Sequence, residues 1–350
     1  MIFSALRKRR SGVALDEPPA ELAARRSTED LIAEIEDLTR SNRESRDPES
    51  EVRLVLLRHA AGIRLMEDSG VEARFPEPAF DRLPDRNGEL AGITADQLSP
   101  EVLRAGILRD GCLLVRGVLS RDEADYLVEQ INSAFDARAA LRRGQPADPG
   151  YYRELPLEPR FAGEEGGREW TAAGGGLWVA DSPHLMFEML DCFERAGLTN
   201  VIDDYLGERP TISVQKCTLR KVNPDAGHGW HQDGAFLGDV RALNVWLALS
   251  RCGDESPGMD IVPKRLDHIV PTGTEGAIFD WSVAPQLAEE AAGETGVLRP
   301  IFEPGDVLLF DELFLHSTAA DPSMKKSRMA IESWFFGASA SPRQYAPLAV

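Results

Sequence analysis

The spacing of apolar residues changes along the chain from helix-like to strand-like. Before about residue 210, apolar residues recur at helical spacing in segments 29–40, 51–67 and 182–206. After it, the apolar runs are short, rich in β-branched residues and separated by Gly or Pro turns. Five such runs predict strands over 211–222, 243–249, 258–262, 307–310 and 329–336. Helices followed by strands, without regular βα alternation, predict an α+β protein: an antiparallel sandwich or barrel flanked by helices.

Capping signals mark two helices ahead of these strands. A Ser-Pro dipeptide begins a helix over 100–110, because serine caps well and proline suits the first helical position. The apolar run 112–115 then predicts a strand. Ser120 and Glu123 form a capping box, which begins a helix that runs to about residue 139.

Two parts of the chain are poorly patterned, although the second of them contains the helical candidates 29–40 and 51–67. The glycine-rich segment 163–176 has no strand-turn-helix context, so it is interpreted as a mobile loop and not as a phosphate-binding loop. Residues 1–95 are dense in charge, with a polar linker over 41–50. They form either a loosely docked extension, helical or partly disordered, or an arm that makes a homodimer. The chain is therefore divided into an extension, 1–95, and a main domain, 96–350, and the extension is expected to be dispensable for metal chemistry.

Charge and cysteine content narrow the function classes. The 350 residues include 39 Lys and Arg against 58 Asp and Glu, a net charge of −19. Such a surface repels nucleic acid and anionic membranes, so neither is an expected partner. No apolar run approaches the ~20 residues that span a bilayer. The basic start is followed by Asp16 and Glu17 instead of a signal peptide's apolar stretch, and the four cysteines form no CxxC pair. These features predict reduced thiols and a cytoplasmic location.

One constellation of residues predicts a metal site. His231 and Asp233 are two positions apart, so in an extended segment their side chains point to the same side. A second histidine would complete a triad of two imidazoles and one carboxylate, which suits non-haem Fe(II). His316 is the best candidate, because it follows the apolar run 307–310. Arg328 begins a later strand, and its guanidinium could hold the far carboxylate of a diacid cosubstrate that chelates the metal.

The chain resembles the phytanoyl-CoA dioxygenase-like family of Fe(II)/2-oxoglutarate-dependent oxygenases over about residues 99–340. The matching stretches occur in the family's order. They are Asp110–Gly117, Trp230–Gly234, Leu243–Leu249, Pro304–Asp306, Phe310-Asp311, His316 and Arg328–Ala330. The resemblance implies a double-stranded β-helix, also called a jelly roll and similar to cupins. It implies His231, Asp233 and His316 as iron ligands.

The resemblance also implies how the cosubstrate is held and what the protein does. Arg328 would anchor 2-oxoglutarate, with help from the Thr318 hydroxyl, and Asn244 and Gln215 on adjoining strands are candidates to touch 2-oxoglutarate or substrate. The implied reaction is hydroxylation of an unactivated C–H bond with O2 and conversion of 2-oxoglutarate to succinate. The implied substrate is a small molecule: an acyl-CoA, an amino-acid derivative or a secondary metabolite. The glycine-rich segment 163–176 would close over it.

Two other functions are compatible with these residues. One is a catalytically silent jelly-roll protein that binds a metal or metabolite for sensing or scaffolding. The other is a cupin enzyme that uses the metal without 2-oxoglutarate. Asp233 also separates the chain from halogenases, in which a small residue replaces the metal-binding carboxylate, so hydroxylation or desaturation is favoured.

Overall fold

Two antiparallel sheets face each other at the centre of the molecule. The structure, a computed structural model, describes residues 18–68, 72–86, 89–161, 167–226 and 229–350. The large sheet has eight strands in the order β1-β2-β7-β5-β9-β4-β10, with β3 paired to β4, and the small sheet pairs β6 with β8. Only the β1–β2 pair is parallel among the pairs within these sheets. The strands are β1 (Gly92–Thr94), β2 (Cys112–Arg116), β3 (Gly176–Trp178), β4 (Pro210–Val222), β5 (Ala242–Ala248), β6 (Gly258–Ile261), β7 (Val307–Phe310), β8 (His316–Ala319), β9 (Arg328–Gly337) and β10 (Pro347–Ala349).

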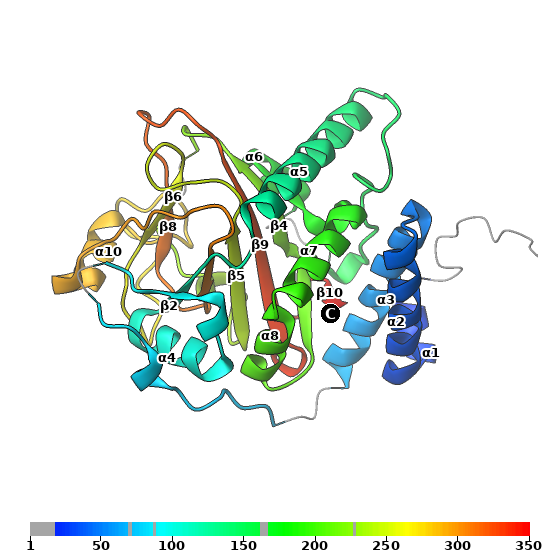
Figure 1. Cartoon of the computed structure of the whole chain (residues 1–350), viewed down its shortest axis with the longest axis horizontal. Coiled ribbons are helices and arrows are strands. Elements are labelled where there is room, and N and C mark those ends of the chain that lie inside the picture. The colour runs from blue at the N-terminus through cyan, green and yellow to red at the C-terminus, as the bar shows by residue number, and fades with distance from the viewer. Residues whose placement is uncertain (1–17, 69–71, 87–88, 162–166, 227–228) are drawn as a thin grey trace, which may run out of the picture.

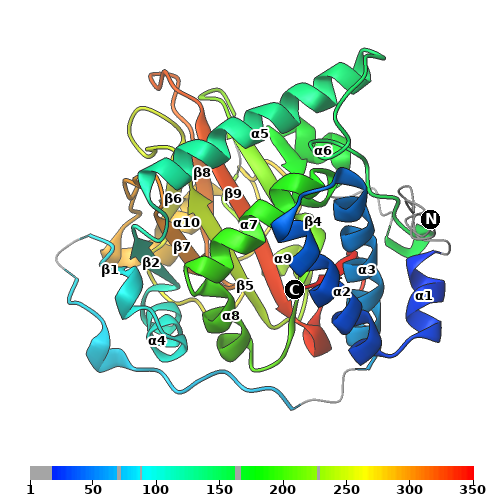
Figure 2. The ribbon, with the colours of Figure 1, turned by 45° about the vertical axis from the view of Figure 1, so that its right-hand side comes forward.

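Helices cover the outer face of the large sheet (Figure 1). The α-helices are α1 (Pro19–Arg25), α2 (Thr28–Glu44), α3 (Pro48–Glu67), α4 (Pro100–Asp110), α5 (Arg121–Arg142), α6 (Arg168–Ala173), α7 (Pro183–Arg195), α8 (Leu198–Leu206), α9 (Gly234–Leu237) and α10 (Pro285–Ala292). Helices α5, α7 and α8 cross in front of β4, β5 and β9 (Figure 2). None of the described helices is long and apolar enough to cross a membrane.

Strand alternation divides the core into two layers. On β5, Leu243, Val245 and Leu247 pack outward into the cluster shared with the helices. Trp246 on the same strand faces the small sheet, among Phe302, Phe310 and other inner residues. Because side chains alternate, the polar residues at even-numbered positions of β5 and β9 also face inward. The two facing sheets confirm the predicted α+β jelly roll, and the inner layer is where its site residues lie.

A tight turn at Gly305 and Asp306 holds the start of β7 against the end of β2. Gly305 has φ +92°, and a Cβ there would overlap the Leu119 carbonyl oxygen. The next residue, Asp306, accepts hydrogen bonds from the Arg116 guanidinium at 2.6 Å and the Gly117 N–H at 3.0 Å. The turn thus fixes the start of β7 against the end of β2.

The N-terminal helices are not loosely docked. Arg58 in α3 donates to the Ala349 carbonyl at 2.9 Å, and His59 Nδ1 donates to the Pro347 carbonyl at 2.8 Å. Thirteen residues of α3 are buried, and its apolar side chains belong to the same core cluster as the large sheet. The apolar patterns over 29–40 and 51–67 predict helices, but they do not indicate which part of the chain packs against those helices. The long-range contact with the C-terminal strand β10 could therefore not be predicted.

This packing makes the extension a stabilising part of the fold. A Cβ at Gly62 would lie 2.7 Å from the Pro347 carbonyl oxygen. We expect Gly62→Ala to lower the free energy of unfolding by about 1–3 kcal/mol, because α3 would be pushed away from β10. Thermal and urea unfolding measure this, with Glu36→Ala at an exposed position of α2 as control. Equal stability of the two variants would contradict the close contact.

Several predicted boundaries need correction. The linker over 41–50 is wrong, since α2 continues to Glu44 and α3 begins at Pro48. The segment 182–206 contains two helices, separated by Gly197 at φ +74°. The mobile loop over 163–176 is wrong for its described part, which forms α6 and the start of β3; residues 163–166 lie outside the described residues. The predicted helices over 100–110 and from 120, and the five predicted strands, are present.

Candidate active site

His231 and His316 are held opposite each other by the main chain. The His231 N–H donates to the His316 carbonyl at 2.9 Å, and the His316 N–H donates to the His231 carbonyl at 3.0 Å. This antiparallel pair places the two imidazole centroids 4.3 Å apart. One pair of backbone hydrogen bonds therefore brings together two histidines that are 85 positions apart in the sequence.

Asp233 completes a compact group of three candidate ligands. It directly precedes the short helix α9, and the next residue, Gly234, donates its N–H to the Glu312 carbonyl at 2.8 Å. The Asp233 Oδ2 lies 3.9 Å from His316 Nε2. One ligand atom from each of His231, Asp233 and His316 lies within 4.8 Å of the other two. The structure thus brings together the three residues that the sequence analysis predicted as metal ligands.

Backbone carbonyls orient both imidazoles for metal binding. His231 Nδ1 donates to the Gly229 carbonyl at 2.9 Å, and His316 Nδ1 donates to the Phe314 carbonyl at 3.0 Å. With Nδ1 protonated, a neutral ring carries its lone pair on Nε2. Burial lowers the pKa of His231 to about 4 and also lowers the pKa of His316, so both rings are neutral at pH 7. Two oriented neutral imidazoles and one carboxylate form a donor set that suits Fe(II) and leaves positions open.

Arg328 is a buried cation whose charge acts on His316, and it has no carboxylate partner among the described residues. The residue is 3% exposed, and its Nη1 donates to the Gly258 carbonyl at 2.9 Å. Its Nε has no hydrogen-bond partner, and Arg328 forms no ion pair with any described residue. Burial lowers its pKa to about 10, which leaves it charged at pH 7. A buried, charged guanidinium with a donor to spare fits the carboxylate of a bound molecule.

Two more inward-facing polar side chains lack partners. Neither amide atom of Asn244, which is fully buried, has a hydrogen bond, and the indole N–H of Trp334 has none. They are direct neighbours in the register of β5 and β9. Buried polar groups are nearly always paired, so these two also fit a polar ligand inside the jelly roll. Thr318 lies on β8 two positions after His316, and alternation places both on one face.

The sequence analysis missed Trp334 as a polar contact and over-interpreted Gln215. Nothing in the local sequence marks Trp334, because the absence of a partner for its indole N–H depends on the surroundings in three dimensions. Gln215 lines the cavity described below, but its Nε2 donates to the Phe161 carbonyl at 2.8 Å and its Oε1 accepts from the Ala346 N–H at 3.0 Å. Both ends of this amide already join main-chain segments, so the structure does not support a cosubstrate contact.

Gln232, between the two nearby ligands, was also missed. Its Nε2 donates to the carbonyls of His268 and Leu313, and its Oε1 accepts from the Val270 N–H at 2.7 Å. The residue is fully buried. Gln232 therefore joins the loop around residue 269 to the segment that precedes His316. It is a positioning residue, and no local sequence signal marks it.

Replacing this amide should loosen the ligand group. We expect Gln232→Leu to weaken Fe(II) binding by roughly tenfold, in the range seen when groups that support metal ligands are removed. Stability should also fall, because each buried group left unpaired costs about 1–3 kcal/mol. Fe(II) titration and thermal unfolding measure both effects, with the exposed Gln286→Leu on α10 as control. Wild-type metal affinity with wild-type stability would contradict this role.

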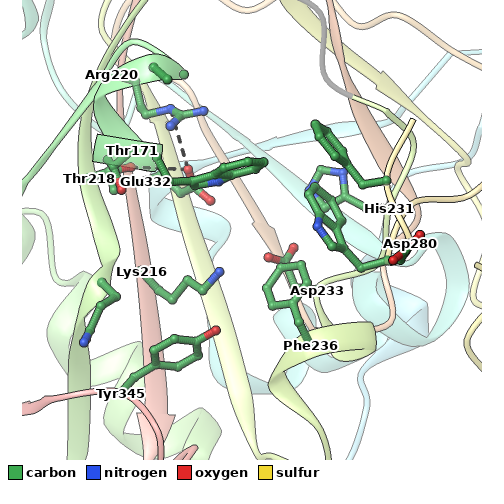
Figure 3. Close-up of a pocket in the computed structure, with 16 residues that line it drawn as sticks. Thr171, Lys216, Thr218, Arg220, His231, Asp233, Phe236, Asp280, Glu332 and Tyr345 are labelled. Carbon is green, nitrogen blue, oxygen red and sulfur yellow. Dashed lines mark hydrogen bonds and ion pairs between the residues drawn. The ribbon is translucent and has the colours of Figure 1, made fainter. Parts of the chain in front are cut away.

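A cavity of about 570 Å³ opens in front of His231 and Asp233. One wall is formed by Lys216, Thr218 and Arg220 of β4 with Glu332 of β9, as Figure 3 shows. The facing wall is aromatic and consists of Phe236, Phe279, Trp281 and Trp170. The cavity thus joins the ligand group to a space of the size that holds small molecules. Of the six histidines, His228 lies outside the described residues.

Comparison with known proteins places this site in a family. Residues 107–330, more than half of the chain, match the family model described as phytanoyl-CoA dioxygenase. No curated protein matches the chain. The chain is similar to several solved structures at low sequence identity. EctD from S. alaskensis, with 2-oxoglutarate and 5-hydroxyectoine, is 18% identical over 78% of this chain and 86% of its own, with a TM-score of 0.46. SnoK, a non-heme alpha ketoglutarate dependent carbocyclase from nogalamycin biosynthesis, is 16% identical over 73% and 90%, with a TM-score of 0.47.

The family match agrees with the geometry of the site. It spans the last residues of α4, both histidines, Asp233 and the start of β9. Membership of this family favours neither of the two alternative functions, a catalytically silent jelly-roll protein or a cupin enzyme that uses the metal without 2-oxoglutarate. The chain belongs to the phytanoyl-CoA dioxygenase family and is an Fe(II)/2-oxoglutarate-dependent oxygenase that acts on a small molecule with O2.

Proposed function

We propose that the protein hydroxylates a C–H bond of a small organic molecule in the cavity, with His231, Asp233 and His316 as the iron ligands. The observation that carries this proposal is the pairing of two features. Three ligand atoms within 4.8 Å of one another lie at the cavity, and the charge of a buried guanidinium, which has no carboxylate partner among the described residues, acts on one of them. The first would hold the metal and the second one end of 2-oxoglutarate.

In this proposal each polar side chain has one task. Arg328 binds the far carboxylate of 2-oxoglutarate through its two-pronged guanidinium, and the Thr318 hydroxyl assists it. Asn244 hydrogen-bonds the cosubstrate between Arg328 and the metal. The Gly229 and Phe314 carbonyls keep the two imidazoles in the tautomer that offers Nε2 to the metal. The aromatic wall excludes water from the side on which the substrate lies.

When bound, iron supplies the oxidative decarboxylation of 2-oxoglutarate with O2, to succinate and CO2, and the oxidation of the C–H bond. The carboxylate Asp233 favours hydroxylation over halogenation, because it occupies the position that a halide would take. The substrate would be a member of one of the three classes expected: an acyl-CoA, an amino-acid derivative or a secondary metabolite.

An anaerobic titration tests the proposal directly. Fe(II) and 2-oxoglutarate added together should produce a weak visible charge-transfer band, which neither produces alone. Succinate formation on admission of O2, together with a mass gain of one oxygen in a metabolite, should follow. A protein that binds Fe(II) but forms no band with 2-oxoglutarate would be inconsistent with this assignment.

We further propose that the protein acts in the cytoplasm and has no nucleic acid or membrane partner. The net charge of −19 and the four buried, unpaired cysteines support this. The division into 1–95 and 96–350 and the homodimer stay predictions. Light scattering of the full chain measures the oligomeric state.

A further inference from the structure

The large apolar side chains that line the cavity are aromatic, which points to the chemical class of the substrate. Resting on the proposed function, we propose that the substrate carries a planar unsaturated ring that binds against the aromatic wall, and that Trp281 is the residue that determines this preference. The composition of the cavity, the contacts of Trp281 and the fixed position of its loop each support a part of this proposal.

The lining of the cavity differs in composition from the rest of the chain. Phe, Trp and Tyr make up 7% of the sequence, but they are five of the sixteen described residues that line the cavity. None of those sixteen is Leu, Ile, Val or Met, although the hydrophobic core is rich in Leu, Ile and Val. A cavity for a flexible acyl chain would use such adaptable side chains. The five aromatic residues are Trp170, Phe236, Phe279, Trp281 and Tyr345.

Trp281 contacts every other residue of the aromatic wall. Its ring stacks on Phe279 with centroids 4.9 Å apart and an interplanar angle of 10°. It stands nearly perpendicular to the Phe236 ring and to the His231 ring, each at 5.6 Å. The Trp170 ring lies 6.4 Å from Trp281 and 5.3 Å from Phe279. Because His231 is a proposed metal ligand, a substrate ring bound on this wall lies close to the site of the reaction.

The loop that carries Trp281 is held by the main chain next to a proposed metal ligand. The Val283 N–H donates at 2.7 Å to the carbonyl of Trp230, the residue that precedes this ligand. The Ser282 side chain is fully buried, and its hydroxyl donates to the Phe279 carbonyl at 2.9 Å and accepts from the Phe279 N–H at 2.8 Å. A surface that is held in this way needs little reordering on binding, so it favours ligands of matching shape.

A planar unsaturated ring complements this wall better than a saturated body does. Aromatic pairs attract each other beyond the area that they bury, in offset-stacked or edge-to-face arrangements with centroids about 4.5–7 Å apart. The contacts within the wall already use both arrangements, at 4.9 Å to 6.4 Å. An aromatic substrate ring adds to the same pattern, whereas a saturated body gains only from the burial of its surface.

The same observations narrow the expected substrate classes. A fatty acyl-CoA would place a flexible saturated chain against fixed aromatic rings, with no Leu, Ile, Val or Met among the described residues that line the cavity. Amino-acid derivatives and secondary metabolites that contain an aromatic or conjugated ring fit the wall. Of the three expected classes, ring-containing members of these two are therefore favoured.

Uncharged alcohols with matched carbon skeletons test the inference by binding. The full chain is loaded anaerobically with Fe(II) and 2-oxoglutarate. Equilibrium dialysis then compares benzyl alcohol with cyclohexylmethanol and 1-heptanol, and 2-naphthylmethanol with its decahydro derivative. We expect at least one aromatic alcohol to bind about threefold or more tightly than its saturated counterparts. A cavity that selects only by apolar surface would give the reverse order, because the saturated compounds are more hydrophobic.

Variants locate the preference in the wall. Trp281→Leu keeps an apolar side chain but removes the ring, so the preference should disappear or reverse, whereas Trp281→Phe should keep part of it. Phe80→Leu, at an exposed position outside the cavity, should bind all probes as the wild type does.

The outcomes separate this inference from the proposed function. If no aromatic alcohol binds more tightly than its saturated counterparts, with or without measurable binding of either, the inference is overturned. It is also overturned if the wild-type preference survives in Trp281→Leu, or in Phe279→Leu should the former fail to fold. Absence of the charge-transfer band before any probe is added would instead reject the proposed function.

Discussion

Asp233→Ala should abolish hydroxylation and weaken Fe(II) binding between about 100-fold and about 4,000-fold. The carboxylate is the one anion among the three ligand atoms that lie within 4.8 Å of one another. Removing one partner of a buried charge pair costs about 3–5 kcal/mol, and about 1.4 kcal/mol corresponds to a factor of ten. Fe(II) titration under anaerobic conditions measures the affinity, and succinate formation measures the activity.

Stability separates loss of the ligand from loss of the fold. Burial raises the pKa of Asp233, which means that its charged form is disfavoured in the metal-free protein. The thermal midpoint of metal-free Asp233→Ala should therefore not fall below that of the wild type. Asp280→Ala, at an exposed carboxylate beside the same cavity, is the matched control and should retain Fe(II) binding. Near-wild-type turnover by purified Asp233→Ala would remove this residue from the metal site.

The candidate ligands could be predicted because their geometry is largely local. His231 and Asp233 are only two positions apart, although Asp233 starts the turn into α9 and does not continue a strand. His316 follows an apolar strand that the jelly roll must place nearby. Arg328 begins a strand of clear apolar pattern. Such patterns do not predict which buried polar atoms lack a hydrogen-bond partner in the folded protein. Asn244 and Gln215 looked alike in the sequence, yet the first has no hydrogen bond and the second has both ends engaged.

The N-terminal helices show the same limit for the fold. The stripes over 29–40 and 51–67 predict helices, and α2 and α3 are present there. Their short lengths and dense charge gave no sign that α3 packs against β10, nearly 300 positions later. This contact depends on close packing of Gly62 against the Pro347 main chain, which the spacing of apolar residues does not reveal. Truncation near residue 95 should therefore destabilise the main domain, although the proposed cofactor residues all lie beyond it.

Arg328→Ala should weaken 2-oxoglutarate binding between about 30-fold and about 700-fold while Fe(II) affinity hardly changes. The guanidinium is 3% exposed and has no carboxylate partner among the described residues, so the cosubstrate would supply the missing charge. Truncation would leave that carboxylate in a partly dry pocket without its partner. Losing a charge-assisted pair of this kind costs about 2–4 kcal/mol, which sets the expected range.

Two further variants distinguish anchoring from support of the strand. Arg328→Lys keeps a charge but loses the planar fork, so its 2-oxoglutarate affinity should lie between those of Arg328→Ala and the wild type. Arg299→Ala removes an arginine that pairs with Asp260 at the surface, and it should bind both ligands normally. Separate titrations with Fe(II) and with 2-oxoglutarate measure the two affinities. Unchanged 2-oxoglutarate affinity in Arg328→Ala would exclude the residue from the site. Joint loss of iron and cosubstrate would show instead that Arg328 holds β9 against β6 through the Gly258 carbonyl.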